Sequence, residues 1–389
     1  MSDRDPETKA PSRGWGEMLG FFIFVSLFIS LICAGIGVVI SIIYSPDSSI
    51  DWKYVLGSVL FALFLIISQF IAHLNHSRPM FPLYLVSSVG LAVFFYSFLL
   101  SILSGPVLLV LYAFGITFHE LPFTNSLRVL PPVFMAGIIT YGSLNARILR
   151  RRKVNIPVIK KDRNVRIALI SDLHLGLLVG KTRLDAIIKT LKKEKPDIIV
   201  LAGDFLDTNP RFLDRFRSFV MDMVSISTVY SVTGNHEFYN GLRDSMDWLR
   251  SLGVNILDNR SIIDQKTDII MIGIHDPSAF KEGGEYAGTL ASLIAKAEKN
   301  GIKILVNHQP LLFHKSAEMG IDIQLSGHTH AGQMWPFSLG TKAIFKEGYK
   351  GLNRWKDSYL YVCQGTGTWG PPLRIGTSSE IVILDLIKK

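Results

Sequence analysis

The chain has 389 residues, of which 48% are hydrophobic, and it carries a formal net charge of +9. Its apolar residues are concentrated in the N-terminal part, so a single ordinary soluble domain is excluded and two or three domains are expected. The two cysteines, Cys33 in an apolar run and Cys363 in a strand-like run, are interpreted as buried residues without a disulfide. This usage is compatible with a cytoplasmic catalytic part.

The N-terminal part contains five runs of apolar residues. They cover residues 18–44, 54–72, 81–103, 106–118 and 129–149. A membrane-spanning helix needs about 20 apolar residues. The fourth run is shorter and begins at Gly105-Pro106, so it is either a thin span or the return leg of a bent hairpin. We therefore expect a transmembrane region over residues 18–149 with four or five helices, preceded by a cytoplasmic or external tail over residues 1–17.

Residues 150–163 form a basic segment that is expected to be a linker. It contains Arg150, Arg151, Arg152, Lys153, Lys160, Lys161 and Arg163. Because Lys and Arg accumulate on the cytoplasmic side of membrane proteins, we expect the C-terminal domain on the cytoplasmic side of an inner or plasma membrane. We interpret this charge as an anchor on the lipid bilayer and expect no nucleic-acid partner. Basic residues in the N-terminal tail favour the same side, which supports an even number of spans.

From residue 164 to residue 389, short β-rich runs alternate with helical stretches, the pattern of an α/β domain. Strands are expected at 165–171, 197–201, 228–232, 269–274, 302–306, 322–325, 359–363 and 380–386. Helices are expected at 181–193, 211–223, 242–252 and 289–299. Ligands gather beyond the carboxyl ends of strands in such sheets, so the residues that follow these strands are the candidates for a functional site.

Seven potential metal ligands stand where these strands end. They are Asp172, His174, Asp204, Asn235, His308, His328 and His330. Two divalent cations about 3.5–4 Å apart need a bridging oxygen as well as terminal ligands. A carboxylate can bridge and an imidazole cannot, so Asp204, alone after Gly203, is the expected bridge. Buried core histidines and helix-capping aspartates are the alternative, but they do not explain why every candidate follows a strand.

The other ligands divide between the two ions. One ion is expected to be held by Asp172 and His174, which are two residues apart, together with the distant His330. The second is expected to be held by Asn235, His308 and His328. This mixture of oxygen and nitrogen donors suits Mn, Fe, Zn or Co better than Ca. Such ions lower the pKa of bound water, and His236, which is surplus as a ligand, is expected to act as the acid that protonates the leaving oxygen.

Four blocks of the sequence, SDLHLG, LAGDFLD, TGNHE and SGHTHAGQ, and the closing stretch from GYKGL onward resemble the calcineurin-like metallophosphoesterases. The resemblance covers residues 165–386 and is strongest to a membrane-attached branch with bacterial phosphodiesterases and UDP-2,3-diacylglucosamine pyrophosphatases. It implies a β-sandwich flanked by helices, the ligand sets given above with Asp204 shared by both ions, and His236 as the acid. His275-Asp276 departs from the family, where two acids are frequent, as does the context of His308.

Further residues are assigned to the surroundings of the site. Asp207 and Glu237 are expected to orient the ligands, and Arg374 is expected to contact phosphate. Gly203, Gly234 and Gly327 are expected to allow sharp turns beside the ions. The aromatic-rich run over residues 366–372 is either a rigid turn or a wall of the cleft.

The expected function is that of a membrane-attached, metal-dependent hydrolase of phosphoric esters or anhydrides. A lipid-linked substrate such as UDP-2,3-diacylglucosamine, which belongs to lipid A biosynthesis, would explain the membrane anchor. One alternative is a phosphodiesterase for soluble or cell-wall phosphate esters. Another is a membrane sensor or transporter with a regulatory phosphoesterase-like domain, although the few charges inside the apolar runs argue against transport.

Overall fold

The computed structural model describes residues 15–45, 49–75, 77–122, 124–158, 164–208, 210–280, 283–297 and 300–388. Most of the expected N-terminal tail and the end of the basic segment lie outside the described residues. The chain forms two compact units. The first comprises Met1–Asn75 and Pro82–Ile139, and the second comprises His76–Phe81 and Thr140–Lys389.

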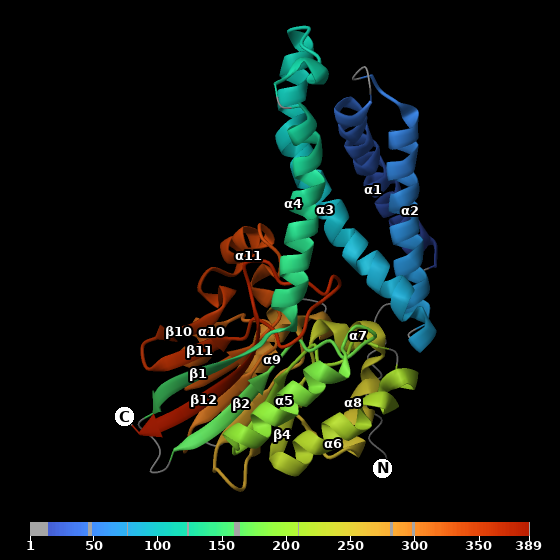
Figure 1. The fold of residues 1–389 in the computed structure, drawn as a ribbon. Coiled ribbons are helices and arrows are strands. Elements are labelled where there is room, and N and C mark those ends of the chain that lie inside the picture. The colour runs from blue at the N-terminus through green and yellow to red at the C-terminus, as the bar shows by residue number, and fades with distance from the viewer. Residues whose placement is uncertain are drawn as a thin grey trace. The chain divides into compact units, whose positions relative to one another are not determined.

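The first unit is built from long apolar helices (Figure 1). They are α1 (Trp15–Tyr44), α2 (Trp52–Leu74), α3 (Phe81–Ala113) and α4 (Thr124–Arg147), of which α4 ends in the second unit. Among the described residues, these four helices have the length and apolar character needed to cross a membrane. The run that begins at Pro106 is not a separate span, because α3 continues through this proline. Apolar helices tolerate an internal proline when neighbouring groups satisfy the freed carbonyl.

The second unit contains two six-stranded sheets (Figure 1). The first sheet has the order β1 (Leu149–Val158), β12 (Ser379–Lys388), β2 (Val165–Ile170), β3 (Ile198–Ala202), β4 (Thr228–Val232) and β5 (Asn255–Ile256). The second has the order β10 (Gly351–Trp355), β11 (Ser358–Val362), β9 (Ile323–Ser326), β8 (Lys303–Val306), β7 (Ile270–Gly273) and β6 (Arg260–Ile263). Strands β2 to β5 are mutually parallel, as are β7, β8, β9 and β11.

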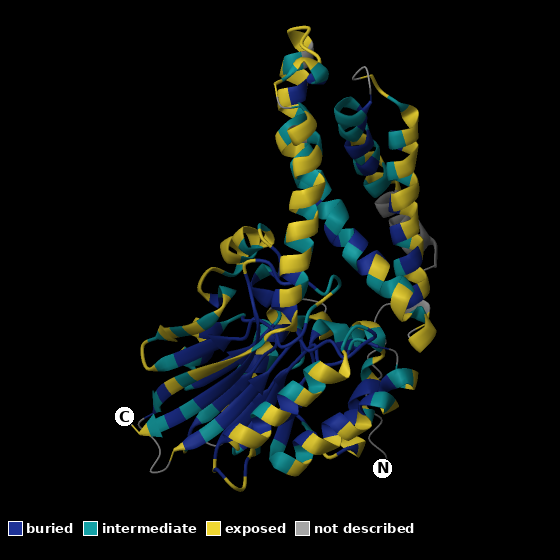
Figure 2. Cartoon of the chain, viewed as in Figure 1, coloured by how far each residue is buried: buried dark blue, intermediate teal, exposed yellow. Residues whose placement is uncertain are grey.

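Helices cover the outer faces of the two sheets, which gives the expected sandwich flanked by helices. The α-helices are α5 (Lys181–Glu194), α6 (Arg217–Ile226), α7 (Asn235–Asn240), α8 (Leu242–Ser251), α9 (Gly283–Lys296), α10 (Phe313–Glu318) and α11 (Phe337–Phe345). Short 3-10 helices cover Arg78–Met80, Phe118–Glu120, Pro210–Phe216, Pro277–Ala279, His330–Gly332 and Lys346–Tyr349. One buried cluster joins apolar side chains of both sheets, including Val200 and Val306, while a second joins the first sheet to α5, α6 and α8. Figure 2 shows the strands as the most deeply buried part of the unit.

The basic segment differs from its expected role as a linker. Its first part forms the edge strand β1, which pairs in parallel with β12. On this strand, Arg151 lies 2.5 Å and Lys153 lies 2.8 Å from the carboxylate of Glu194, and both basic side chains remain partly exposed. Charged side chains along an edge strand disfavour pairing with a second chain. The basic cluster therefore has a structural role in the sheet that the sequence pattern did not indicate.

Candidate metal centre

The predicted ligands lie beyond the carboxyl ends of strands, and these strands belong to both sheets. Asp172 and Asp204 follow β2 and β3 of the first sheet, whereas His308 and His328 follow β8 and β9 of the second. Asn235 follows β4 and is the first residue of α7. The site is thus assembled where two sheets meet at their carboxyl ends, rather than at the edge of one open sheet.

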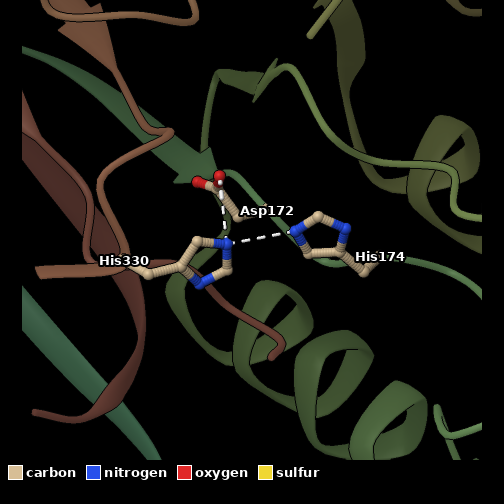
Figure 3. A group of neighbouring side chains, drawn as sticks. All are labelled: Asp172, His174 and His330. Atoms are coloured by element: carbon tan, nitrogen blue, oxygen red, sulfur yellow. Dashed lines mark hydrogen bonds and ion pairs between the residues drawn. The ribbon is translucent and has the colours of Figure 1, made fainter. Parts of the chain in front are cut away.

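Asp172, His174 and His330 form the first group of ligands (Figure 3). One potential ligand atom from each lies within 4.8 Å of the others. Nε2 of His330 lies 3.1 Å from Nε2 of His174 and 3.5 Å from Oδ1 of Asp172. All three residues are buried. Such a cluster of two imidazoles and one carboxylate converging on a common point matches the donor set of a transition-metal site.

Asp204, His308 and His328 form the second group, again with ligand atoms within 4.8 Å of one another. Nδ1 of His308 donates to the carbonyl of Ala202 over 2.8 Å, so Nε2 is the ring nitrogen that is left to bind an ion. That Nε2 lies 3.2 Å from Oδ2 of Asp204 but makes no hydrogen bond to any described residue. The amide oxygen of Asn235 lies 3.2 Å from Nδ1 of His328, which places Asn235 beside this group.

A cation would fit both groups on electrostatic grounds. Burial lowers the pKa of His174 and of His328 to about 4, so both rings are neutral at pH 7 and can act as ligands. Burial raises the pKa of Asp172 to about 6, and the nearby charge of Asp204 adds to this increase. Burial lowers the pKa of His308, but the negative charge of Asp204 outweighs burial and raises that pKa well above its usual range. A divalent ion between these two side chains would take the place of the ring proton as the positive charge beside Asp204.

The backbone at most of the ligands adopts a conformation that the sequence did not indicate. Five of the seven have positive φ angles: Asp172 (49°), His174 (50°), Asp204 (47°), His328 (69°) and His330 (47°). Residues other than glycine rarely adopt this left-handed conformation, which costs on the order of 1 kcal/mol each. Such strain is concentrated at functional sites because the surrounding structure must enforce it.

Three glycines next to the ligands were expected to allow sharp turns of the backbone, but two of them instead make room for ligand side chains. Only Gly203 has a positive φ, of 82°, whereas φ of Gly234 is −106°. A Cβ atom at Gly234 would collide with Oδ1 of Asp204, and a Cβ atom at Gly327 would collide with Oδ2 of Asp172. The absence of a side chain at these two positions therefore makes room for the ligand carboxylates.

Glu237 supports the loop that carries Asp204, as the sequence suggested. Its buried carboxylate accepts hydrogen bonds from the backbone N–H groups of Gly234 (2.7 Å), Asp204 (3.1 Å), Phe205 (2.8 Å) and Leu206 (2.9 Å). Burial and the charge of Asp204 raise the pKa of Glu237 to about 7, whereas the backbone N–H donors favour its ionised form. The carboxylate therefore joins the loop after β3 to the loop after β4 and fixes the position of Asp204.

His236 lies beside the first group and is held by Asp207. Its ring centroid is 4.6 Å from that of His174, and Nδ1 donates to Oδ1 of Asp207 over 3.0 Å. Burial lowers the pKa of His236, but the hydrogen bond and charge of Asp207 outweigh burial and raise the pKa to about 9. The ring is therefore protonated at neutral pH. His174, Asp207 and His236 are also close enough to hold an ion together.

Arg374 is not placed to contact a substrate phosphate, contrary to expectation. Its side chain is fully buried and donates to the carbonyl oxygens of His330 (2.9 Å) and Gly367 (2.7 Å). Burial, followed by the charge of Arg374, lowers the pKa of His330 well below its usual range. Arg374 thus orients His330 through hydrogen bonds to this loop and keeps the His330 ring neutral. A histidine must be neutral to bind a metal ion.

Aromatic residues lie beside the ligands. The ring of Trp369, from the run over residues 366–372, lies 6.0 Å from that of His236, so this run lies next to the site. Phe345 at the end of α11 lies 5.8 Å from the ring of His328. The sequence does not mark Phe345 as part of the site, because neither its spacing nor its residue type distinguishes it from an ordinary core aromatic.

Comparison with known proteins agrees with the fold. The family model described as calcineurin-like phosphoesterase matches residues 165–332. An uncharacterized metallophosphoesterase of Campylobacter jejuni is 34% identical over 264 residues, which cover 65% of this chain and 68% of that protein. An uncharacterized metallophosphoesterase of Helicobacter pylori is 29% identical over 76% of this chain and 80% of its own length.

A third relative is named as a transmembrane protein. The bovine (Bos taurus) "transmembrane protein with metallophosphoesterase domain" is 31% identical over 57% of this chain and 53% of its own length, so the match spans about half of that protein. Together with the four apolar helices, this similarity indicates that the chain is associated with a membrane. The chain belongs to the calcineurin-like metallophosphoesterases and is a hydrolase of phosphoric esters or anhydrides.

Proposed function

We propose that the chain is a membrane-attached phosphoesterase whose site holds two divalent metal ions. The first ion would be bound by Asp172, His174, Asp204 and His330. The second would be bound by Asp204, Asn235, His308 and His328. The observation that carries this proposal is the pair of ligand groups, buried except for the half-buried His328, each with its ligand atoms within 4.8 Å of one another. The donors suit Mn, Fe, Zn or Co.

The residues around the two groups are suited to phosphoester hydrolysis. Bound divalent ions would activate water and neutralise charge on the phosphoryl oxygens. His236 would donate a proton to the leaving oxygen, since Asp207 keeps its ring protonated at neutral pH. Glu237 and Arg374 would position the ligands Asp204 and His330 without touching the substrate.

The proposed substrate is a lipid-linked phosphodiester or pyrophosphate such as UDP-2,3-diacylglucosamine. Its support is the attachment of the catalytic domain to apolar helices, because a membrane anchor concentrates an enzyme where a lipid substrate resides. The proposed location of the domain is the cytoplasmic side of an inner or plasma membrane, since the basic residues 150–153 directly follow the last apolar helix. A phosphodiesterase for soluble or cell-wall esters would share the metal site but would not need the lipid.

One experiment separates these possibilities. The full-length protein, reconstituted in lipid nanodiscs with Mn²⁺, is assayed on bis-p-nitrophenyl phosphate and on UDP-2,3-diacylglucosamine. We expect both to be hydrolysed, and Asp204→Asn to reduce both rates by at least about 100-fold, because a bridging ligand supports several kcal/mol of transition-state stabilisation. Asp222→Asn, which changes an exposed carboxylate of α6, is the matched control.

The outcomes distinguish the hypotheses. Hydrolysis of the soluble ester alone would refute the lipid-linked substrate and favour the soluble-ester alternative. Equal inactivity of the unmodified protein and Asp204→Asn with Mn, Fe, Zn and Co would refute the enzyme proposal and favour a regulatory domain. Elemental analysis of the unmodified protein adds an independent result, since we expect about two transition-metal ions per chain.

A further inference from the structure

Helix α11 (Phe337–Phe345) is an apolar helix that buries none of its nine residues, all of which the structure describes. Leu339 is 61% exposed and Ile344 is 74% exposed. Figure 2 shows the helix as largely exposed. A helix of a folded domain normally packs apolar side chains against that domain, whereas large apolar side chains that gather at the surface are candidates for an interaction site. The exposed apolar residues of α11 are such a candidate.

Two exposed tryptophans lie on the loops that adjoin α11. Trp335 is 53% exposed and Trp369 is 57% exposed. Gln333 joins the two loops, because its Nε2 donates to the carbonyl of Trp369 over 2.7 Å and its Oε1 accepts from the N–H of Trp369 over 2.9 Å. We refer to Trp335, Leu339, Ile344 and Trp369 as the apolar rim.

The apolar rim borders the metal centre. The ring of Trp369 lies 6.0 Å from that of His236. Phe345, the last residue of α11, lies 5.8 Å from the ring of His328. Any surface that covers the rim therefore lies close to the proposed metal ligands.

The loop that carries the rim is fastened to the end of the last apolar helix. Within the second compact unit, Nδ2 of Asn145 in α4 donates to the carbonyls of Arg374 (2.9 Å) and Thr377 (2.8 Å). The N–H of Trp335 donates to the carbonyl of Ile375 over 2.9 Å, in the same loop. The end of α4 that belongs to this unit therefore lies beside the loop that contacts Trp335.

The charge around the rim suits an anionic lipid surface. Lys342 and Lys346 are exposed on or next to α11, and Lys350 is exposed shortly after it. The nearby acid Glu347 is paired with His314 over 2.7 Å. Exposed apolar residues flanked by Lys are typical of segments that lie in the membrane interface, and tryptophan is enriched at that depth.

We propose that the apolar rim inserts into the interfacial layer of an anionic phospholipid bilayer and so places the mouth of the metal centre against the lipid. An amphiphilic phosphoester could then reach the site without leaving the membrane. This last consequence rests on the proposed function, whereas the insertion itself does not.

Depth-dependent quenching tests the insertion directly. A polarity-sensitive fluorophore is attached to Ile344→Cys in the full-length protein, in nanodiscs that contain anionic phospholipid and a nitroxide-labelled lipid. The native residues Cys33 and Cys363 are buried, so labelling favours the introduced thiol. The matched control is Met221→Cys on α6, where the native Met221 is 53% exposed. We expect at least about twofold stronger lipid quenching at position 344 than at position 221.

Equal quenching at the two positions would overturn the proposal. A shielded but unquenched probe at position 344 would also overturn it, because a second copy of the chain or another protein would then cover the rim. These readouts do not depend on catalysis, so they remain valid if the proposed phosphoesterase activity is not found.

A second measurement tests the consequence for the substrate. Leu339→Ser combined with Ile344→Ser is compared with Met221→Ser in nanodiscs. The two substrates, dioleoylglycerol p-nitrophenyl phosphate and bis-p-nitrophenyl phosphate, share a leaving group. We expect the ratio of lipid to soluble hydrolysis to fall about tenfold in the double variant, as expected when about 1.4 kcal/mol of interfacial binding is lost. An unchanged ratio would show that the rim does not deliver substrate, whereas no hydrolysis by the unmodified chain would count against the proposed function instead.

Discussion

His236 donates a hydrogen bond from Nδ1 to Oδ1 of Asp207, over 3.0 Å. The same carboxylate lies 3.7 Å from Nδ1 of His174 and accepts from Nδ2 of Asn240 over 3.3 Å. This acidic side chain therefore orients the proposed acid and lies next to a proposed metal ligand without a hydrogen bond to it. Because Asp207 has a depressed pKa in this environment, it stays ionised at neutral pH.

The first prediction concerns Asp207→Asn, which retains an acceptor for His236 but removes the negative charge. The pKa of His236 should fall, so the alkaline limb of the pH–rate profile should move to lower pH, since the acid must be protonated to act. We expect kcat/KM for alkyl phosphodiesters to fall about 10–100-fold. The loss should be smaller for p-nitrophenyl esters, whose leaving group needs less protonation. The same pH limb in both proteins would contradict the acid role.

The second prediction concerns Glu237→Gln. In the unmodified protein, the Glu237 carboxylate accepts from backbone N–H groups that include those of Gly234 and Phe205. The amide of the variant places an NH₂ group against some of these donors. We expect a loss of about 2–4 kcal/mol in the free energy of unfolding, since buried donors lose a charge-assisted partner. Metal affinity should fall about 10–100-fold, because the loop that holds Asp204 loses its support.

Chemical unfolding and metal titration of the purified protein measure these two effects. Glu318→Gln, which alters an exposed side chain of α10, serves as the matched control. A Glu237→Gln variant as stable as this control would show that the four backbone contacts contribute little.

The ligands and their strands could be predicted from the sequence because both signals are local. The apolar runs that precede Asp172 and Asp204 predict strands, and the structure has a strand at each of these positions. The backbone conformation of these residues could not be predicted, since a positive φ at a residue other than glycine is imposed by tertiary contacts. The assignment of Arg374 failed for a similar reason: an arginine that contacts phosphate and one buried behind His330 have the same local sequence.

Non-local pairing limited the prediction of the remaining fold. Strand β1 (Leu149–Val158) carries four consecutive basic residues and lacks the alternation of a half-buried strand. It exists because it pairs with β12, more than 200 residues later in the chain. Helix α11 was missed because its nine residues do not show the spacing of an amphipathic helix packed on a core.

The third prediction concerns Gly327→Ala. A Cβ atom at this position would collide with Oδ2 of Asp172 and would lie 2.7 Å from Oγ of Ser171. The ligand carboxylate must then move, so we expect elemental analysis to find about one transition-metal ion per chain instead of about two. Activity should fall about 100-fold or more with the loss of one ion.

Gly288→Ala is the control for this substitution, because a Cβ atom at Gly288 in α9 meets no atom within 4 Å. A Gly327→Ala variant that retains the metal content and activity of the control would show that Asp172 does not need its present position.

The last prediction concerns the pH dependence of stability through Glu194. Burial raises the pKa of this carboxyl, but Lys153, Arg151 and Arg166 outweigh burial and hold the pKa below its usual value. A depressed pKa in the folded state contributes stability that is complete above the unfolded pKa of about 4.3 and is lost as the pH falls through the folded pKa.

We therefore expect Glu194→Gln to lower the free energy of unfolding by about 1–3 kcal/mol at pH 7. The difference from the unmodified protein should shrink below about pH 4, as followed by unfolding of the full-length protein in detergent. A difference that stays constant between pH 7 and pH 3.5 (about one unit below the unfolded pKa) would mean that packing, rather than charge, accounts for the contribution of Glu194.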